Sequence, residues 1–357
     1  MNKKVISVLM SVVLFISLLM PFSAFAGIKN DELKKQVEDD IQGELTYLNF
    51  TPSLSQAVSS QMLFRVDDSK KDVFLTELDT NLAQNGGKVV VNGSENVVYY
   101  AAIINILDLL GEDITDYKGY DFVDLFLNCP NTTVENPYYV MQVVEACQLI
   151  GEDALAHNYI NTLISERYTP GQGMDYYGFS ADNNGMFVAT VGLYKEDYQD
   201  YIDDVLPLIE AQKKENGYDS GWGVTASTTS CVLLAYTVIG DEEKATEAYK
   251  LLVDNFESPE NNGVMQYDGA DDSYATSQAI RSLSYYIELF DDSSIDDSDD
   301  NGNQDKTDDK KDTGSSSQTK TDVKKDDTKK SPNTGAATGL TFLGLGAVAL
   351  AVSRRKK

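Results

Sequence analysis

Aromatic residues gather in the glycine-rich segments between positions 170 and 275, where their side chains can stack on a ligand. Trp222, the chain's single tryptophan, stands between Gly221 and Gly223. A flat aromatic face packs well against a sugar ring, a corrin or a peptide, and it can equally brace one structural repeat against the next. The candidate ligand-binding residues are Tyr176, Tyr177, Phe179, Tyr218, Trp222, Tyr267 and Tyr274.

Carboxylates accompany these aromatic residues and can act as general acids. Asp175, Asp182 and Asp219 are the candidate acids for an enzyme, and Asp182 is the foremost of them. Asp182 also stands at the start of an apolar helix, where a structural role as a helix cap is the simpler interpretation. The sequence therefore favours a non-catalytic protein, with an enzyme that uses Asp182 as the alternative.

Histidine and cysteine are too scarce for most metal and triad chemistry. His157 is the one histidine and is predicted on the polar side of a helix, so a zinc site or a Ser-His-Asp triad has little material. Of Cys129, Cys147 and Cys231, the last two lie inside apolar stretches, where a free thiol acts as a small hydrophobic side chain. We expect no cofactor and no structural disulfide.

An Asp-rich segment near position 300 matches the spacing of a calcium-binding loop only loosely. Gln304 takes the position that is usually apolar in such loops, and no amphipathic helix flanks the segment. A solvated acidic spacer is therefore the favoured interpretation. The weak calcium candidates are Asp297, Asp299, Asn301, Asp305 and Asp308.

Six largely apolar stretches recur along the chain, with starts that are 41 to 47 residues apart. Amphipathic, acid-rich segments alternate with them. A fixed spacing of this kind marks a repeated pair of helices. The sequence predicts an all-α fold, an α6/α6 toroid with six outer/inner helix pairs, whose long glycine-rich loops gather at one end with the N-termini of the inner helices. The predicted inner helices occupy residues 53–65, 96–110, 137–150, 181–194, 227–239 and 274–289.

The two ends of the chain differ in composition from the middle. Lys3 and Lys4 precede a long apolar run, and small residues near position 26 suit signal peptidase, so residues 1–26 are predicted to be a signal peptide. Residues 291–330 contain no aromatic residue and cannot bury a core, which predicts a disordered acidic spacer. The predicted toroid occupies residues 27–290 and a C-terminal segment occupies residues 331–357.

The C-terminal segment joins a polar pentapeptide, an apolar span at 336–352 and a basic tail at 354–357. This order resembles the cell-wall sorting signal of Gram-positive surface proteins, with an LPxTG-type motif in which Ser replaces the usual Leu. The resemblance implies secretion, a transient membrane span, cleavage by a sortase and covalent attachment of Thr334 to peptidoglycan. A permanent membrane anchor is the alternative. The motif residues are Ser331, Pro332, Asn333, Thr334 and Gly335.

Two further segments resemble the repeats of a known superfamily. "QKKENGYDSGWGVTASTTSCVLLAYTVIGDE" and "NGVMQYDGADDSYATSQAIRSLSYY" are similar to the glycine-aromatic repeats of terpene cyclases, protein prenyltransferase β subunits and cobalamin carriers. The resemblance implies an α/α toroid with a central cavity. It does not carry the superfamily's chemistry: only Asp182 of the DxDD acids of class II cyclases is present, the prenyltransferase zinc set is not matched, and the Cys-Gly-Glu-Gln thioester turn does not occur.

The charge balance narrows the function further. A formal net charge of −28 argues against a nucleic acid as partner, because nucleic acids require basic patches. The sequence therefore predicts a wall-anchored surface protein whose non-catalytic toroid binds a small molecule, a glycan or a protein at its loop-rich face. The rivals are an extracellular enzyme that uses Asp182, either cyclase-like or a polysaccharide lyase or hydrolase, and a structural spacer without a ligand.

Overall fold

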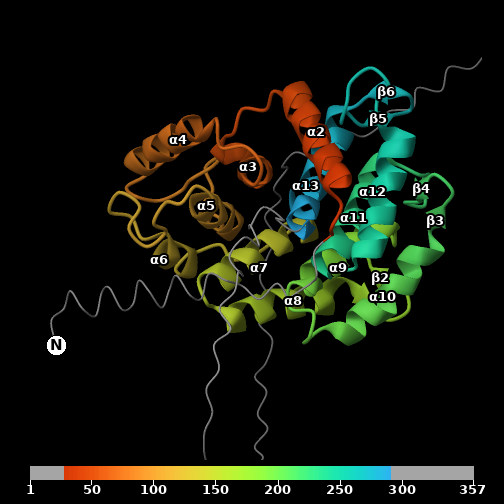
Figure 1. Ribbon diagram of the computed structural model, residues 1–357. Coiled ribbons are helices and arrows are strands. Elements are labelled where there is room, and N and C mark those ends of the chain that lie inside the picture. The colour runs from red at the N-terminus through yellow and green to blue at the C-terminus, as the bar shows by residue number, and fades with distance from the viewer. Residues whose placement is uncertain (1–27, 291–357) are drawn as a thin grey trace, which may run out of the picture. The chain divides into compact units, whose positions relative to one another are not determined.

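The computed structural model of the chain describes residues 28–290 (Figure 1). The predicted signal peptide, the acidic spacer, the calcium candidates Asp297, Asp299, Asn301, Asp305 and Asp308, and the sorting motif Ser331–Gly335 lie outside these residues. The predicted membrane span at 336–352 lies outside them as well. Within residues 28–290, no helix combines the length and the apolar character needed to cross a bilayer.

Six inner helices form a closed ring, which confirms the predicted all-α fold. Each inner helix contacts the next one along the chain, and α13 contacts α3, so the ring closes on itself. These helices are apolar on nearly every side because other helices enclose them. The inner helices are α3 (Ala57–Phe64), α5 (Val97–Leu109), α7 (Val140–Leu149), α9 (Ala181–Gly192), α11 (Ala226–Val238) and α13 (Ser273–Tyr286). Short 3₁₀ turns flank three of them: η1 (Leu54–Gln56), η2 (Pro137–Tyr139) and η3 (Ile287–Leu289).

Six outer helices alternate with the inner ones and pack against them with one apolar stripe. In α10, for example, Ile202, Val205 and Ile209 are buried, at the spacing that places them on one face of a helix. The third outer helix is the shortest, with six residues. The outer helices are α2 (Asp31–Leu48), α4 (Lys71–Gln84), α6 (Phe122–Leu127), α8 (Asp153–Arg167), α10 (Gln199–Ala211) and α12 (Glu242–Phe256).

Inner helices lead into outer helices through tight turns at one end of the ring. Gly111, Gly151 and Gly240 each have a positive φ near 70°, a conformation that glycine adopts without strain. After α7, for example, the amide of Glu152 donates to the carbonyl of Cys147 at 2.8 Å, which completes the helix C-cap. The opposite end of the ring is left for the longer connections.

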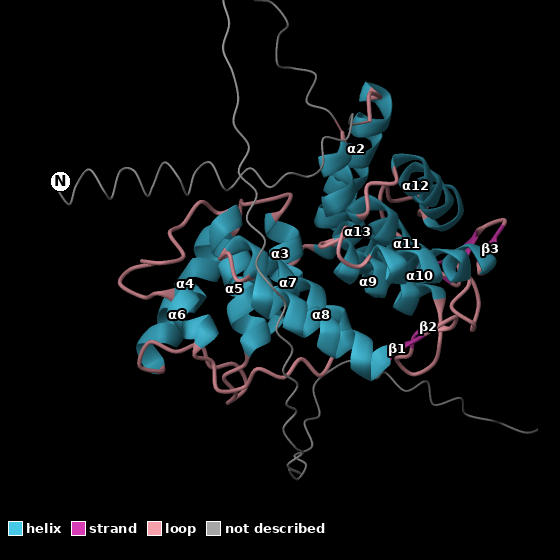
Figure 2. Ribbon diagram, turned by 90° about the horizontal axis from the view of Figure 1, so that it is seen from below, coloured by secondary structure: helices cyan, strands magenta, loops and turns pink. Residues whose placement is uncertain are grey.

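Three of the longer connections contain a small β-hairpin. Figure 2 shows strands of the first two in magenta, and Figure 1 labels the strands of the third. The hairpins are β1 (Tyr168–Thr169) with β2 (Gly173–Met174), β3 (Lys213–Lys214) with β4 (Gly217–Tyr218), and β5 (Gln266–Tyr267) with β6 (Ala270–Asp271). The next inner helix holds each one through a polar side chain: Asn184, Thr229 and Thr276 accept from the amides of Met174, Tyr218 and Met265. Successive repeats therefore present their loops at the same end, beside the N-termini of the inner helices.

The ring closes where the first outer helix meets the last long loop. A methyl group added to Gly43 of α2 would lie 1.9 Å from the carbonyl oxygen of Asn262, so only glycine allows the backbones to approach this closely. Asp40 and Glu44, one turn apart on α2, are buried at this seam. We call Asp40 and Glu44 the seam acids.

Candidate binding site on the ring axis

Several of the predicted aromatic candidates lie exposed on the loops at the N-terminal end of the inner helices. Trp222 is 95% exposed and Tyr177 is 91% exposed. Phe179, Tyr267 and Tyr274 are exposed as well, and Tyr176 is half-buried. Because these residues come from the loops of three successive repeats, they can form contact points along one face of the ring.

Tyr218 does not belong to this group. Its side chain is fully buried, and strand β4, which carries it, packs against α11 and α12. The neighbouring Tyr236 hydroxyl donates to Glu210, deep in the same contact. Prediction of Tyr218 as a ligand-binding residue was therefore wrong, because the hairpin turns this ring inward to support the repeat.

The candidate acids Asp175 and Asp219 build the loops that carry the exposed aromatic residues. Asp175 accepts a hydrogen bond from the amide of Gly178 at 3.0 Å. Asp219 accepts from the amides of Gly221 and Gly223 at 2.8 and 3.1 Å, which fixes the turn around Trp222. These carboxylates hold backbone turns, as Asp commonly does.

Asp182 lies deeper, in the first turn of α9, where its carboxylate contacts Tyr138 from the turn η2 that precedes α7. The hydroxyl of Tyr138 lies 3.2 Å from Asp182 Oδ2 and 2.9 Å from Asn183 Oδ1. The N-cap of α9 is Ser180, whose hydroxyl accepts from the amide of Asn183. The interpretation of Asp182 as the helix cap was therefore wrong, because the helix begins one residue before Asp182. Asp182 Oδ1 is buried and has no hydrogen-bond partner among residues 28–290.

Asn183 ties this pair to the loop above it. Its side-chain amide donates to the carbonyls of Tyr176 and Gly178 at 2.9 and 2.7 Å. The loop 175–179 is therefore anchored to the same residue that contacts the Tyr138 hydroxyl. A ligand that moved this loop would also disturb the hydrogen bonds of Tyr138.

Tyrosine rings surround the Tyr138–Asp182 pair. The ring of Tyr176 lies 5.9 Å from that of Tyr138 and 4.5 Å from that of Tyr177, measured between centroids. Tyr139 lies close enough to raise the pKa of Tyr176 and Tyr274, after the larger effect of burial, and Tyr274 likewise raises the pKa of Tyr138. We call Tyr138, Tyr139, Tyr176, Tyr177 and Tyr274 the tyrosine rim.

Burial keeps the Tyr138 hydroxyl protonated. Desolvation raises the pKa of Tyr138 far above its usual value, and the nearby Cys231 and Asp182 raise it further. Burial likewise raises the pKa of the Cys231 thiol to about 12. Both groups are therefore neutral near pH 7, and Tyr138 acts as a hydrogen-bond donor.

Arg281 lies below the rim, on α13, and reaches across the ring to the start of α7. Its Nη2 atom donates to the carbonyl of Tyr138 at 3.3 Å. With the Gln142 amide turned so that both of its groups are satisfied, Gln142 Oε1 accepts from the same Nη2 at 2.8 Å. Since α7 and α13 are not neighbours in the ring, this contact crosses the interior.

The far end of the axis is closed by a network of paired charges. Arg65 contacts Glu145 at 3.0 Å and Glu288 at 2.7 Å. Its guanidinium also lies 3.8 Å above the ring of Tyr285, whose hydroxyl donates to Glu145. Burial alone would lower the pKa of Arg65, but Tyr285 and the two carboxylates raise it, so the arginine stays charged. Polar side chains, not an apolar plug, therefore fill this end.

No family model matches the chain, and no curated protein matches it. Among solved structures, the chain is similar to a polysaccharide lyase, with a TM-score of 0.48 and 14% sequence identity. The match covers 72% of this chain and 98% of that one. At this level the likeness is no support for a shared activity.

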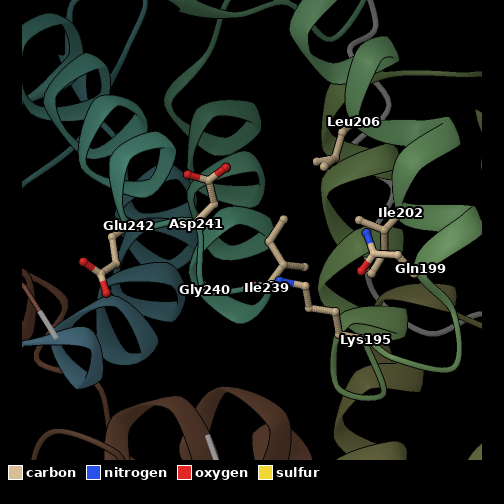
Figure 3. A pocket seen from close by; sticks show the side chains of 8 residues that line it. All are labelled: Lys195, Gln199, Ile202, Leu206, Ile239, Gly240, Asp241 and Glu242. Atoms are coloured by element: carbon tan, nitrogen blue, oxygen red, sulfur yellow. Dashed lines mark hydrogen bonds between the residues drawn. The ribbon is translucent and has the colours of Figure 1, made fainter. Parts of the chain in front are cut away.

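Two grooves lie away from the rim. One of about 360 Å³ separates α10 from the turn between α11 and α12 (Figure 3). Lys195 reaches across it to the carbonyl of Ile239 at 2.8 Å, and Asp241 caps α12 through the amide of Lys244. The second, of about 600 Å³, follows the acidic face of α12 beside Ile28. In the first groove, Lys195 and Asp241 are therefore already engaged in hydrogen bonds to the backbone at helix ends.

The histidine lies on an outer helix, and the three cysteines lie in the interior. His157 lies on the outer helix α8, with Nδ1 3.0 Å from the Tyr198 hydroxyl. Cys129, Cys147 and Cys231 are free and buried. Within residues 28–290, no three His, Cys, Asp or Glu side chains are grouped to hold a metal ion.

The sequence analysis missed Tyr138, Asn183 and Arg281. A signal for Arg281 was present: it is a charged residue near the middle of the largely apolar inner helix predicted at 274–289. A charge in an enclosed helix must face either a partner or the ring interior. Tyr138 and Asn183 gave no comparable signal, because their roles depend on contacts between repeats.

Proposed function

We propose that the toroid binds a glycan at the tyrosine rim. The observation that carries this proposal is the arrangement of exposed aromatic faces around the half-buried Tyr138–Asp182 pair. The C–H faces of sugar rings pack on aromatic rings, while sugar hydroxyls need both donors and acceptors. The rim offers aromatic faces, and Asp182 Oδ1 is an acceptor without a partner among the described residues.

The loops favour a polymer of ring-shaped units over a single small molecule. Tyr177, Trp222 and Tyr267 stand on the loops of three repeats whose inner helices, α9, α11 and α13, are neighbours in the ring. In Figure 1, the hairpin strands β2, then β3 and β4, and then β5 and β6 follow one another along one side of the ring. Asp175 and Asp219 hold two of the loops in place, so less conformational freedom is lost on binding.

Binding fits the chemistry of the rim better than catalysis does. A general base must lose its proton near the working pH, and the raised pKa of Tyr138 prevents this. The carboxylates of Asp175 and Asp219 are engaged by backbone amides of their own loops. Asp182 is therefore the one carboxylate of the three that has a buried oxygen without a partner in residues 28–290.

Affinity electrophoresis tests the proposal directly. The protein is run in native gels that contain a single polysaccharide, such as dextran, xylan, polygalacturonate or dextran sulfate. We expect at least one to retard the wild type, and the double change Tyr177→Ala and Tyr274→Ala to weaken that retardation. Tyr47→Ala is the matched control, because Tyr47 is an exposed tyrosine on α2 outside the rim. Equal retardation of wild type and rim variant, or none for any polysaccharide, would overturn the proposal.

The second candidate is an enzyme in which Asp182 acts as a general acid, and the unpartnered Oδ1 atom favours it. Incubation with the same polysaccharides and measurement of new reducing ends decides between the two. Turnover that disappears in Asp182→Asn, with an unchanged unfolding midpoint, would establish the enzyme. Retardation in the gel without turnover would establish the binder.

We also propose that this toroid is displayed on a Gram-positive cell wall through Ser331–Gly335, as the resemblance of that motif to sorting signals supports. Sortase would then be a partner and peptidoglycan the covalent attachment through Thr334. Two results would support this location: release of the wild type by a muralytic enzyme, and retention of Thr334→Ala in the membrane, because its apolar span is not cut away. A protein extracted by detergent alone would indicate the permanent anchor.

A further inference from the structure

Arg281 is a buried cation whose hydrogen bonds all go to uncharged groups. Its side chain is on the inner helix α13, and the residue is 7% exposed. Nη2 contacts the Tyr138 carbonyl at 3.3 Å and Met141 Sδ at 3.9 Å, besides the Gln142 amide oxygen. Nε is buried without a partner, and no carboxylate in residues 28–290 forms an ion pair with this guanidinium.

An unpaired cation in such a place is unfavourable on physical grounds. Charged side chains are rarely buried unless an opposite charge accompanies them, because desolvation disfavours the isolated ion. Arg65 obeys this rule, with two carboxylates and a tyrosine ring around it. The position of Arg281 therefore has an unmet requirement for an anion.

The missing anion is not supplied by Asp182. Both charges act on the same neighbours: Asp182 raises the pKa of Cys231 and Tyr274, after the larger effect of burial, and Arg281 lowers them. Their side chains are thus in one region, yet they form no ion pair. Asp182 Oδ1 and Arg281 Nε are each left without a partner in the described part of the chain.

We propose that the glycan bound at the tyrosine rim carries an anionic oxygen group, a carboxylate or a sulfate, that pairs with Arg281. Hydroxyls of the same glycan donate to Asp182. This inference rests on the proposed glycan binding and adds the charge of the ligand. A guanidinium suits this role because its fixed fork of N–H donors matches the oxygens of carboxylate and sulfate groups. The chain as a whole is strongly negative, so the attraction must come from this local charge.

The first experiment uses inorganic sulfate and needs no identified glycan. Thermal unfolding is followed in sodium sulfate and in sodium chloride at equal ionic strength. We expect sulfate to raise the Tm of the wild type more than that of Arg281→Met, with Arg281→Lys between them. Without sulfate, Arg281→Met should unfold at or above the wild-type Tm, because an apolar side chain of similar length replaces an unpaired buried ion. Equal sulfate effects in all three proteins, the result of an adventitious ion only, would overturn the inference.

The second experiment compares matched charged and neutral polymers, dextran sulfate with dextran and polygalacturonate with its methyl ester. We expect the charged member of a pair to bind more tightly, and Arg281→Met to weaken it by about 10- to 100-fold, the range for hydrogen bonds to charged groups. Arg167→Met is the control, because Arg167 lies over the ring of Tyr176 at 5.7 Å and is partly exposed. Its loss should have a small effect that high salt abolishes.

These outcomes separate the two proposals. Equal affinity for the charged and neutral members of each pair would overturn the anionic ligand and leave glycan binding intact. Absence of binding to all four polymers would count against glycan binding, and the sulfate experiment would still decide whether Arg281 takes an anion.

Discussion

Two arginines lie inside the ring, one toward each end, and their surroundings are opposite. Arg65 is surrounded by Glu145, Glu288 and the ring of Tyr285, so its charge is compensated on every side. Arg281 is bound to uncharged groups. The buried Nε atoms of both arginines lack a partner among the described residues, so the difference between them is the carboxylates that Arg65 has and Arg281 does not. The charge of Arg65 is therefore paired within the protein, whereas the ligand proposed above would pair the charge of Arg281.

Under the proposed function, stability and ligand binding therefore depend on opposite ends of the ring axis. The contacts of Arg65 join α3, α7 and η3, which are not all neighbours in the ring, and so hold its two sides together. The unmet groups lie near the loops, where each repeat can vary without disturbing the inner helices. Mutations should therefore fall into two classes that depend on the end of the axis they affect.

The largest effect is expected from breaking the closed end. Glu145→Gln removes the carboxylate that Arg65, Gln61 and Tyr285 share, and leaves the arginine with the partly exposed Glu288. We expect the free energy of unfolding to fall by about 3–5 kcal/mol, as when one partner of a buried ion pair is removed. Urea denaturation measures this change. Glu135→Gln, at an exposed position, is the control, and a similar loss in both variants would contradict the role of the network.

The seam acids test the same requirement for a buried anion: they are buried carboxylates that no cation pairs with among the described residues. Burial raises the pKa of Asp40 to about 6, against the hydrogen bond from Tyr249, and raises the pKa of Glu44 well above its usual value. Because the folded-state pKa values are raised, the stabilising contribution is fully present below the unfolded pKa and is lost as the pH rises through the folded values. For Asp40 alone, the shift from 3.8 to about 6 corresponds to a total loss of about 3 kcal/mol, of which about 2 kcal/mol falls between pH 4 and 6.

Glu44→Gln sharpens this prediction because it removes one ionisation from the seam. We expect the variant to be more stable than the wild type at pH 8 and to lose less stability between pH 4 and 8. Glu38→Gln, on the exposed side of the same helix, should follow the wild-type curve. Thermal unfolding across this pH range provides the measurement, and a wild type that gains stability toward pH 8 would refute the assignment.

The sequence predicted the ring well because periodicity reports burial. The predicted inner helix at 96–110 is α5 at Val97–Leu109, and the apolar stripe of Ile202, Val205 and Ile209 is buried in α10. The site could be predicted only in part. Trp222 was correctly placed on a glycine-rich loop, but whether a ring points outward, as Trp222 does, or inward, as Tyr218 does, depends on the hairpin and on Thr229 beneath it.

The contacts near the ring axis could not be predicted from single segments, because each one joins residues that are far apart in the sequence. Tyr138 meets Asp182 across 44 positions, and Arg281 reaches Tyr138 across 143 positions. Such pairs arise from the closure of the ring, which brings α13 beside the first repeats. Their residue types alone, a tyrosine, an aspartate and an arginine, are common on any surface and indicate no partner.

At the ligand end, Tyr138→Phe should reduce binding while leaving the fold intact. The change removes the hydroxyl that contacts Asp182 and Asn183 but keeps the ring and its packing against Tyr176. We expect about a tenfold loss of affinity for the bound glycan, and a stability change near 1 kcal/mol, the net value of one hydrogen bond. Calorimetric titration and urea denaturation give the two numbers. A loss of stability as large as that of Glu145→Gln would place Tyr138 with the closed end.

The smallest structural effect is expected at Trp222, the most exposed of the aromatic candidates. Trp222→Ala should change the free energy of unfolding by less than about 0.5 kcal/mol, because the turn is held by Asp219 and not by the indole ring. Binding of a long polysaccharide should weaken by about fivefold, the value of one aromatic contact, whereas a fragment too short to reach from the rim to this loop should bind as before. Gel retardation with polymers of graded length measures this. An equal loss of affinity for short and long fragments would mean that Trp222 belongs to the rim itself. No loss of affinity for either would mean that the loop between β4 and α11 is not part of the binding face.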